Sequence, residues 1–275
     1  MNIVVCVKQV PASNEVKLNR ETGTIIREGV ASIINPYDSY ALEEALRLKE
    51  SLGGQVTTIS MGIPSVAGLL KTTLALGADR AVLLTDRKFA GADTLATAYA
   101  LAKGIDRLGS FDLIICGKQA TDGDTAQVGP SLAEKLGIPH VTNVQQIVKI
   151  DRQKICCRRL TDTGEETVEL ELPALITVVK DINLPRLPSI SGLRKAQDQQ
   201  VALWSADDVN ADPDCIGLHG SATQVTKTFV PTRERESERL LGDARQQARQ
   251  LVDRLLAQGL LSLSEGKGGG ESHNG

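Results

Sequence analysis

The most informative stretch of the chain runs from Gly117 to Pro130, where a short apolar segment gives way to small and polar residues ahead of a helical pattern. Small residues let a ligand approach the backbone, and the free amides at the start of a helix bind phosphate. Asp122 and Asp124 fit this less well, because carboxylates repel phosphate. We expect them to cap the helix, bond backbone amides or accept ribose hydroxyls. The pattern alone also allows a second interpretation, in which the stretch is only a tight, well-capped turn.

Motifs typical of catalysis are missing from the sequence. It contains no GxGxxG after a strand, no GxxxxGK[ST], no HExxH and no GxSxG. The histidines, His140, His219 and His273, lie far apart in the sequence, and no nucleophile is paired with a base. Cys6 and Cys116 fall within apolar strands, where packing is the expected role of a free cysteine. The sequence therefore predicts a binder of a nucleotide-like ligand rather than an acid–base catalyst.

Alternating strands and helices must position the 117–130 stretch. A buried strand is predicted over 3–7, and a helix over 37–50 starts after Asn35-Pro36 and ends at Gly53-Gly54. Further strand–helix pairs follow at 55–62 and 65–77, at 80–86 and 94–109, and at 112–118 and 125–137. Short apolar strands joined through helices predict an α/β, doubly wound, mainly parallel Rossmann-like sheet with helices on both faces. In such a sheet, ligands bind outside the carboxyl ends of the strands.

The pattern changes after residue 140. Strand-like segments at 141–150, 153–160, 165–172 and 174–180 are joined by polar turns, which predicts an antiparallel extension of the sheet or a small attached layer. Residues 181–196 hold prolines and a glycine without periodicity, so a long ordered loop is expected there, and 198–235 is irregular. An amphipathic helix is predicted over 236–262, with Leu240, Ala244, Ala248, Leu251 and Leu255 on one face. We expect a nucleotide-binding domain over 1–200, a C-terminal arm over 201–262 and a disordered tail over 263–275.

Composition narrows the function classes. The chain has 275 residues, 31 basic and 34 acidic, with a net charge of −3, and no basic stripe, which disfavours a nucleic-acid partner. No apolar run approaches the roughly 18 residues of a membrane helix, so we expect no membrane insertion. The five cysteines contain no CxxC pair, which predicts reduced thiols and a cytoplasmic protein. The adjacent Cys156 and Cys157 have no third ligand nearby in the sequence, so no metal site is predicted.

Several spaced motifs resemble those of the beta (small) subunit of electron transfer flavoproteins. They cover nearly the whole chain apart from its last residues. The matching segments are Val5–Pro11, Ile34–Asp38, Ala75–Asp79, Cys116–Pro130, Leu172–Thr177, Pro185–Ser189 and Gly220–Val225. The resemblance implies an adenine nucleotide alpha hydrolase-like version of the Rossmann-like fold, and an arm over 201–262 that contacts an alpha subunit.

The resemblance also implies a function. In this family an alpha–beta heterodimer carries electrons between dehydrogenases, or NADH, and acceptors, and the alpha subunit holds one FAD. The beta subunit holds either a structural AMP or a second FAD that takes hydride from NADH and bifurcates its electrons. Asp122–Pro130, with Asp86-Arg87 and Phe89–Thr94, resembles the bifurcating, two-FAD type, because Gly123, Thr125 and Ala126 leave room for a dinucleotide. The implied partners are the alpha subunit, an acyl-CoA-type or other dehydrogenase, NADH, and ferredoxin or flavodoxin.

Two sets of site residues follow from the resemblance. The cofactor-binding residues would be Cys6, Asn35, Pro36, Tyr37, Asp38, Met61, Asp93, Thr94, Gly117, Lys118, Gln119, Ala120, Thr121, Asp122, Gly123, Asp124, Thr125, Ala126, Gln127 and Val128. The loop that recognises partner dehydrogenases would comprise Arg186, Leu187, Pro188, Ser189, Ile190, Ser191, Gly192, Leu193, Arg194 and Lys195. Ile190 stands where the family usually has leucine, and Ala222 where proline is common. No catalytic residue is implied.

Two rival classes remain open at this stage. One is a stand-alone adenine-nucleotide-binding module of the stress-protein kind, which would form a homodimer, bind ATP and need no proline-rich loop. The other is an adenylate-forming or ATP-cleaving enzyme, which would carry a Ser-Gly-Gly-type loop after the first strand. Lys8-Gln9-Val10-Pro11 does not resemble such a loop.

Overall fold

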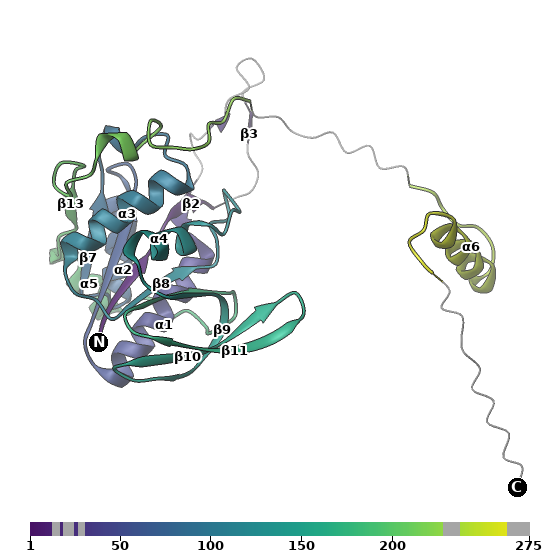
Figure 1. Ribbon diagram of the computed structural model, residues 1–275, viewed down its shortest axis with the longest axis horizontal. Coiled ribbons are helices and arrows are strands. Elements are labelled where there is room, and N and C mark those ends of the chain that lie inside the picture. The colour runs from purple at the N-terminus through teal and green to yellow at the C-terminus, as the bar shows by residue number, and fades with distance from the viewer. Residues whose placement is uncertain (13–16, 19–24, 27–30, 228–236, 263–275) are drawn as a thin grey trace, which may run out of the picture. The chain divides into compact units, whose positions relative to one another are not determined.

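The structure, a computed structural model, describes residues 1–12, 17–18, 25–26, 31–227 and 237–262 (Figure 1). The chain falls into two compact units, Met1–Thr228 and Phe229–Gly275. The first unit contains the sheet and its covering helices, and the second contains the helix α6, Ala244–Ala257.

A nine-stranded sheet forms the centre of the first unit, in the order β11-β10-β9-β12-β8-β1-β6-β7-β13. The strands from β9 to β13 in this order run parallel, and β10 and β11 are antiparallel to their neighbours. The strands are β1 (Asn2–Cys6), β6 (Gln55–Met61), β7 (Arg80–Leu84), β8 (Leu113–Gly117), β9 (His140–Ile150), β10 (Lys154–Thr161), β11 (Gly164–Glu171), β12 (Ala174–Val178) and β13 (Ala202–Trp204). The predicted doubly wound, mainly parallel sheet is therefore confirmed.

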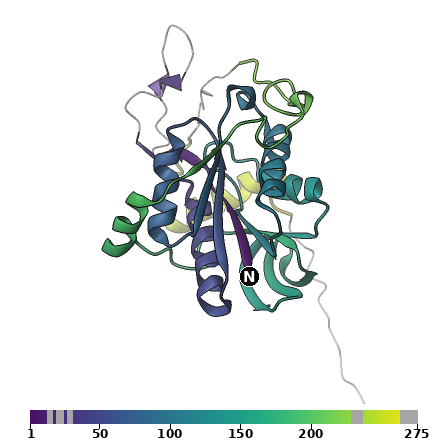
Figure 2. The ribbon, with the colours of Figure 1, turned by 90° about the vertical axis from the view of Figure 1, so that its left-hand side faces the viewer.

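Helices cover both faces of this sheet (Figure 2). The helices α1 (Pro36–Leu52), α2 (Val66–Leu76) and α5 (Ile190–Asp198) share one apolar core with one face of the sheet. The helices α3 (Thr94–Leu108) and α4 (Val128–Leu136) share a second core with the other face. Each apolar strand contributes side chains to both cores in alternation, as expected of a parallel sheet that is buried on both faces.

The helix α1 shows how sequence sets an element. Pro36 occupies the first helical position, where its missing amide costs no hydrogen bond, and Gly53 ends the helix at φ 73°. Two short antiparallel ladders are separate from the nine-stranded sheet, β2 (Gln9–Pro11) with β5 (Ser32–Ile34), and β3 (Lys17–Leu18) with β4 (Ile25–Ile26). The first of these ladders places Asn35 directly ahead of α1.

The antiparallel extension is smaller than predicted. Among the strands of the nine-stranded sheet, only β10 and β11 run antiparallel to their neighbours, whereas the predicted extension also included the segments that form β9 and β12. The strand β12 lies inside the sheet between β8 and β9, and all five of its residues are buried. Its sequence Ala-Leu-Ile-Thr-Val, which is apolar except for Thr177, is typical of a central parallel strand covered on both faces.

Two further predictions need correction in the region after residue 180. The expected loop over 181–196 contains α5, whose first turn is capped by Ser189 accepting a hydrogen bond from the Gly192 amide at 3.0 Å. The expected irregular region contains β13, which adds to the edge of β7. The strand β13 was not predicted because three residues are too few to show periodicity.

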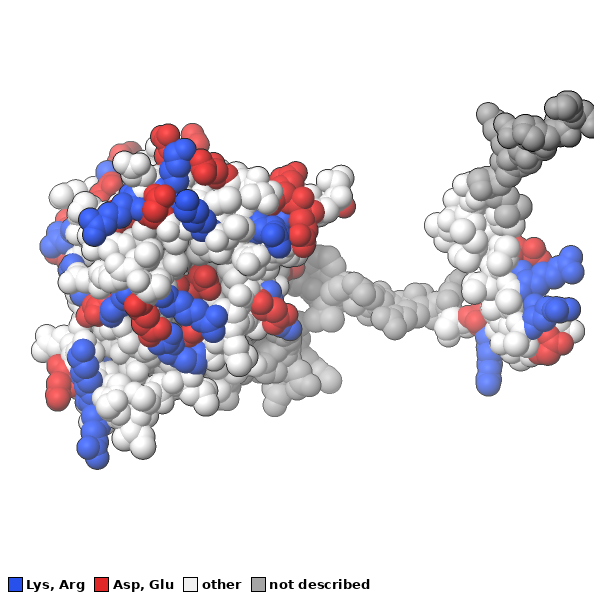
Figure 3. Space-filling view, turned by 90° about the horizontal axis from the view of Figure 1, so that it is seen from below, with Lys and Arg blue, Asp and Glu red and all other residues white. Residues whose placement is uncertain are grey.

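The C-terminal helix is also shorter than predicted. Asp243 and Gln246 form a capping box, so α6 begins at Ala244, and Leu240 precedes the helix. Residue 236 and the predicted tail over 263–275 lie outside the described residues. No helix in the described part of the chain has the length and apolar character to cross a membrane. Figure 3 shows acidic and basic side chains intermixed over the face that it displays, without a continuous basic surface.

Candidate functional site

The sheet has a switch point between β1 and β8. The chain builds β1, β6 and β7 in one direction across the sheet and then places β8 on the other side of β1. In doubly wound sheets, ligands bind at the carboxyl ends of the strands where the order reverses. A cavity of about 350 Å³ lies there, with Cys6 at the end of β1 and Cys116 and Gly117 at the end of β8 among its walls.

Most of the predicted binding residues meet at this cavity. Those that line it are Cys6, Asn35, Asp38, Met61, Asp93, Thr94, Gly117, Lys118, Gln119, Ala120, Gly123, Thr125, Ala126, Gln127 and Val128. Five others in the predicted set do not line it, namely Pro36, Tyr37, Thr121, Asp122 and Asp124. Residues separated by more than 80 positions in the sequence thus share one cavity.

Sequence reasoning missed seven lining residues, Val7, Lys8, Ala92, Thr97, Leu101, Cys116 and Gly129. A signal existed for four of them. Thr97 and Leu101 follow Thr94 at helical spacing, so a helix that presents Thr94 to the cavity presents them as well. Lys8 and Cys116 follow or end predicted strands, and the strand-end rule was sufficient to include them.

The side chain of Asn35 holds the loop that follows β8. Its Nδ2 donates to the carbonyl oxygen of Gln119 at 2.8 Å, and its Oδ1 accepts from the Thr121 amide at 3.2 Å. Asn35 is only 1% exposed, so both bonds form away from water. A single buried side chain therefore fixes the first turn of the loop, which the Asp124 amide continues by donating to the Ala120 carbonyl at 2.8 Å.

The loop then turns its backbone in an unusual way before α4. Asp124 and Ala126 have φ values of 52° and 54°, and Gln127 returns to the right-handed region. Adjacent left- and right-handed residues point successive amides toward one site, which forms an anion-binding concavity. Gln127, the residue at the start of α4, makes no side-chain cap, so the first amides of this helix keep their capacity for a ligand.

The carboxylates of Asp122 and Asp124 have partners in this loop. Asp122 forms an ion pair with the Lys8 ammonium at 2.7 Å, and Asp124 accepts a hydrogen bond from the side chain of Gln119. Neither caps α4, so the predicted capping role is wrong. Because both carboxylates are paired with donors, they oppose an anion at the neighbouring amides less than the sequence indicated.

Two glycines let α1 and α4 approach the strand ends. A Cβ at Gly117 would lie 2.4 Å from Oδ1 of Asp38, and a Cβ at Gly129 would lie 2.5 Å from Cγ2 of Thr177. Real Cβ atoms do not approach other atoms so closely, so only glycine fits at either position. These contacts bring the start of each helix to the edge of the cavity.

Asp38 and Cys116 are titratable groups in the cavity wall whose pKa values are raised. Burial raises the pKa of Asp38 from 3.8 to about 7, although hydrogen bonds from Asn35 and from the Lys8 and Gly117 amides oppose this. The Lys8 amide donates to the Asp38 carboxyl at 2.7 Å. A hydrogen bond with Cys6, together with burial, raises the pKa of Cys116 well above its ordinary value. The Cys116 thiol is therefore protonated near neutral pH and does not act as a nucleophile.

The start of α3 closes another side of the cavity. The Asp93 carboxylate caps α3 through the Leu95 and Ala96 amides, and its other oxygen accepts from the Thr223 amide at 2.9 Å and hydroxyl at 3.0 Å. Burial raises the pKa of Asp93, but these hydrogen bonds outweigh it and hold the pKa below its ordinary value. The Thr94 hydroxyl donates to Gln127 at 2.9 Å, so α3 and the 117–127 loop are joined across the cavity.

The predicted recognition loop is not part of this cavity. None of the residues from Arg186 to Lys195 lines it, and the loop instead packs on the α1 and α2 face of the unit. The part of the chain that the structure describes holds no group of three or more His, Cys, Asp or Glu side chains arranged for a metal ion.

Known proteins similar to this chain share one family. The family model described as "Electron transfer flavoprotein domain" matches residues 22–209. The "Electron transfer flavoprotein subunit beta" of Thermoanaerobacterium thermosaccharolyticum is 49% identical over 93% of this chain and 98% of its own length. The "Caffeyl-CoA reductase-Etf complex subunit CarD" of Acetobacterium woodii is 46% identical over 88% and 92%. The "Protein FixA" of Bradyrhizobium diazoefficiens is 43% identical over 92% and 90%.

Proposed function

The chain belongs to the electron transfer flavoprotein family as an electron-transferring beta subunit, and from this premise we propose that the cavity at the ends of β1 and β8 holds FAD. The observation that carries the proposal is the backbone of residues 123–128, with its left-handed Ala126 and the uncapped start of α4. Such amides bind a diphosphate without a charged side chain. The proposed binding residues are the predicted set, from Cys6 to Val128, together with Lys8 and Thr97.

The cavity suits the adenine nucleotide part of the ligand. Its volume of about 350 Å³ lies at the lower end of the roughly 300–1,000 Å³ range of ligand pockets. The loop over 121–125 is exposed, so a longer ligand has room to extend past it. The dinucleotide's remaining half would then lie outside the cavity, where an alpha subunit would cover it.

The bound flavin would supply the redox chemistry. The chain's own residues would bind the FAD and orient it. The amides over 125–127 would hold the diphosphate, because those of Gly123 and Asp124 donate to the Ala120 carbonyl. Asn35 keeps their loop in place, and Asp38, at the start of α1, would lie beside the adenine and ribose end. Lys8, now paired with Asp122 at 2.7 Å, lies near enough to the cavity to add a positive charge beside an anion.

A structural AMP in the same cavity is the second candidate. The observation in its favour is the volume, which suits a mononucleotide more readily than a whole dinucleotide. In that case the beta subunit would belong to a simple electron carrier, and bifurcation would be absent.

The partners proposed for this chain follow from its family. An alpha subunit with its own FAD would form the heterodimer and would contact the predicted C-terminal arm, residues 201–262. A dehydrogenase of the acyl-CoA type would dock on the 186–195 loop, and NADH and ferredoxin or flavodoxin would complete a bifurcating system. We propose the cytoplasm as its compartment.

Cofactor analysis tests the proposal. The alpha and beta subunits are purified together, the cofactors are released by heat, and FAD and AMP are quantified by chromatography. Close to two FAD per heterodimer supports the two-flavin subunit, and one FAD with one AMP supports the simple carrier. One FAD without any adenine nucleotide in the beta subunit would overturn both. The beta subunit purified alone should carry little flavin.

A further inference from the structure

Three apolar side chains project from the segment that leads into α5. Leu184 is 82% exposed, Leu187 is 88% exposed and Ile190 is 76% exposed. Exposed apolar residues grouped in this way mark contact sites for partners, particularly when polar residues surround them. This segment packs on α1 and α2, and none of these three residues lines the nucleotide cavity.

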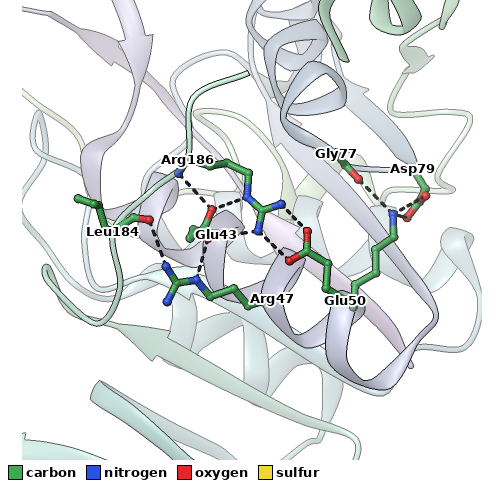
Figure 4. A network of polar contacts seen from close by, with 8 residues as sticks. Glu43, Arg47, Glu50, Gly77, Asp79, Leu184 and Arg186 are labelled. Atoms are coloured by element: carbon green, nitrogen blue, oxygen red, sulfur yellow. Dashed lines mark hydrogen bonds and ion pairs between the residues drawn. The ribbon is translucent and has the colours of Figure 1, made fainter. Parts of the chain in front are cut away.

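A guanidinium fixes the segment to α1 at Arg186 (Figure 4). Its Nε donates to Glu43 at 2.8 Å and its Nη2 donates to Glu50 at 3.1 Å, with a further contact between Nη1 and Glu50. The Arg186 amide also donates to Glu43 at 3.2 Å. A single residue therefore joins the segment to two carboxylates that lie two helical turns apart on α1.

Glu43 is a buried acceptor that this arrangement satisfies. Its side chain is only 5% exposed. Burial raises the pKa of Glu43, but hydrogen bonds from Arg186 and Arg47 outweigh it and hold the pKa below its ordinary value. Arg47 donates to Glu43 at 2.7 Å and to the Leu184 carbonyl at 3.3 Å. A buried carboxylate with two guanidinium partners is costly to disrupt, so it makes a firm point of attachment.

Two more contacts hold the segment on either side of its exposed residues. Asn183 donates to the Tyr40 carbonyl at 3.0 Å and to Glu44 at 2.9 Å. Gly192 packs so tightly on α2 that a Cβ there would lie 2.2 Å from the Ala75 carbonyl oxygen. The exposed residues Leu187 and Ile190 thus lie between attachment points on α1 and α2.

We propose that Arg186 is a positioning residue for docking, which holds Leu187 and Ile190 ready to enter an apolar pocket of a redox partner. This rests on the proposed role of the 186–195 loop. The partner is a dehydrogenase that exchanges electrons with the heterodimer. A loop already ordered in its bound conformation binds with a smaller entropy cost. The contacts of Arg186 with Glu43 and Glu50 therefore favour affinity for the partner rather than the rate of electron transfer.

Arginine suits this position better than lysine. The planar guanidinium presents several N–H donors in a fixed arrangement, which allows it to serve both carboxylates at once. A lysine ammonium at the same position reaches one of them well. Arg186→Lys should therefore restore part of what Arg186→Gln loses.

The test uses the purified alpha–beta pair, with a short-chain acyl-CoA dehydrogenase and its acyl-CoA as electron donor. Arg186→Gln should raise the KM for the pair about fivefold and leave kcat within about twofold. Hydrogen exchange in the peptide over 184–193 should become faster, and flavin content should stay unchanged. Arg158→Gln is the matched control, because it also removes a guanidinium paired with a carboxylate. That pair, with Glu165 at 3.8 Å, lies on the β10–β11 hairpin and not on the 186–195 loop.

The outcomes separate the inference from the proposed function. Leu187→Ala and Ile190→Ala test docking directly. If they raise KM and Arg186→Gln changes neither KM nor exchange, the positioning role is overturned and docking stands. If neither they nor Arg186→Gln change KM, or the wild-type pair is not reduced, the loop's docking function fails and the inference fails with it. If Arg186→Gln unfolds the chain, Glu50→Gln serves instead, because it weakens only the exposed contact of Arg186 and leaves the contact with Glu43. An unchanged KM for both Glu50→Gln and Arg186→Lys would then count against the inference.

Discussion

The side-chain amide of Asn35 donates to the carbonyl oxygen of Gln119 at 2.8 Å, and so joins the start of α1 to the loop after β8. The two residues are 84 positions apart in the sequence. This contact, with the second bond to Thr121, fixes the loop whose amides we propose to hold a diphosphate.

Asn35→Ala should destabilise the chain and weaken nucleotide binding together. The substitution leaves the Gln119 carbonyl and the Thr121 amide without their buried partner, which costs about 1–3 kcal/mol of unfolding free energy. Urea unfolding measures the loss, and cofactor release measures the nucleotide retained. Gln145→Ala removes an exposed side-chain amide that bonds Glu165, and should change both quantities little. Full nucleotide content in Asn35→Ala would contradict the role of this contact.

Gly129→Ala should destabilise the chain because its Cβ would meet Cγ2 of Thr177 at 2.5 Å. Such overpacking costs about 1–3 kcal/mol. Adding Thr177→Ser removes the methyl group and keeps the hydroxyl, which accepts from the Asn143 amide at 3.2 Å. Stability should then recover in the double variant. Gly123→Ala is the control, since a Cβ there meets nothing within 4 Å. Equal stability of Gly129→Ala and the wild type would show that the approach of α4 is not constrained.

Asp38 should make stability depend on pH in a defined window. Its pKa is raised from 3.8 to about 7 in the folded chain, so the folded state holds an extra proton between these values. The stabilisation is complete below about pH 4 and is lost as the pH rises through about 7. The wild type should therefore lose stability relative to Asp38→Asn, on the order of a few kcal/mol, as the pH rises from about 4 to 8.

The control for this dependence is Asp162→Asn, which alters an exposed carboxyl on the β10–β11 turn. Its stability difference from the wild type should be nearly constant over the same pH range. A flat difference for Asp38→Asn would mean that Asp38 titrates near its ordinary pKa.

Asp93→Ala should free the Thr223 segment as well as weaken α3. Losing the helix cap costs about 1 kcal/mol, and losing both bonds to Thr223 removes a second attachment. Ser189→Ala is matched to it, because Ser189 caps α5 and holds no distant segment. Hydrogen exchange at Thr223 should become faster only in Asp93→Ala. Unchanged exchange there would mean that Asp93 does not hold the segment.

Local signals predicted much of the fold. Asn35-Pro36 and Gly53 marked both ends of α1, and apolar runs marked the parallel strands. The position of β12 inside the sheet was missed, because strand order depends on contacts between distant residues that periodicity does not encode. The α5 helix was missed because Pro185, Pro188 and Gly192 are loop signals, whereas the Ser189 cap and the packing against α2 outweigh them.

The contrast between local signals and contacts of distant residues also explains which parts of the site could be predicted. The small residues of the 117–130 loop indicated a ligand-binding turn, and the structure places most of them around one cavity. The pairing of Asp122 with Lys8, across 114 positions, had no local signal. Arg186 was included only as part of a predicted loop, because its partners Glu43 and Glu50 lie 143 and 136 positions away in the sequence and no local signal links them.

A comparison of the nucleotide bound by the wild-type pair and by its Thr97→Trp variant tests the central claim most directly. Thr97 projects from α3 into the cavity wall, so an indole there would fill space needed by the adenine nucleotide. The account predicts that the variant keeps the alpha subunit's FAD and loses the nucleotide of the beta subunit, whereas Thr72→Trp on α2 keeps both. Undiminished beta-subunit nucleotide in a folded Thr97→Trp pair would contradict it.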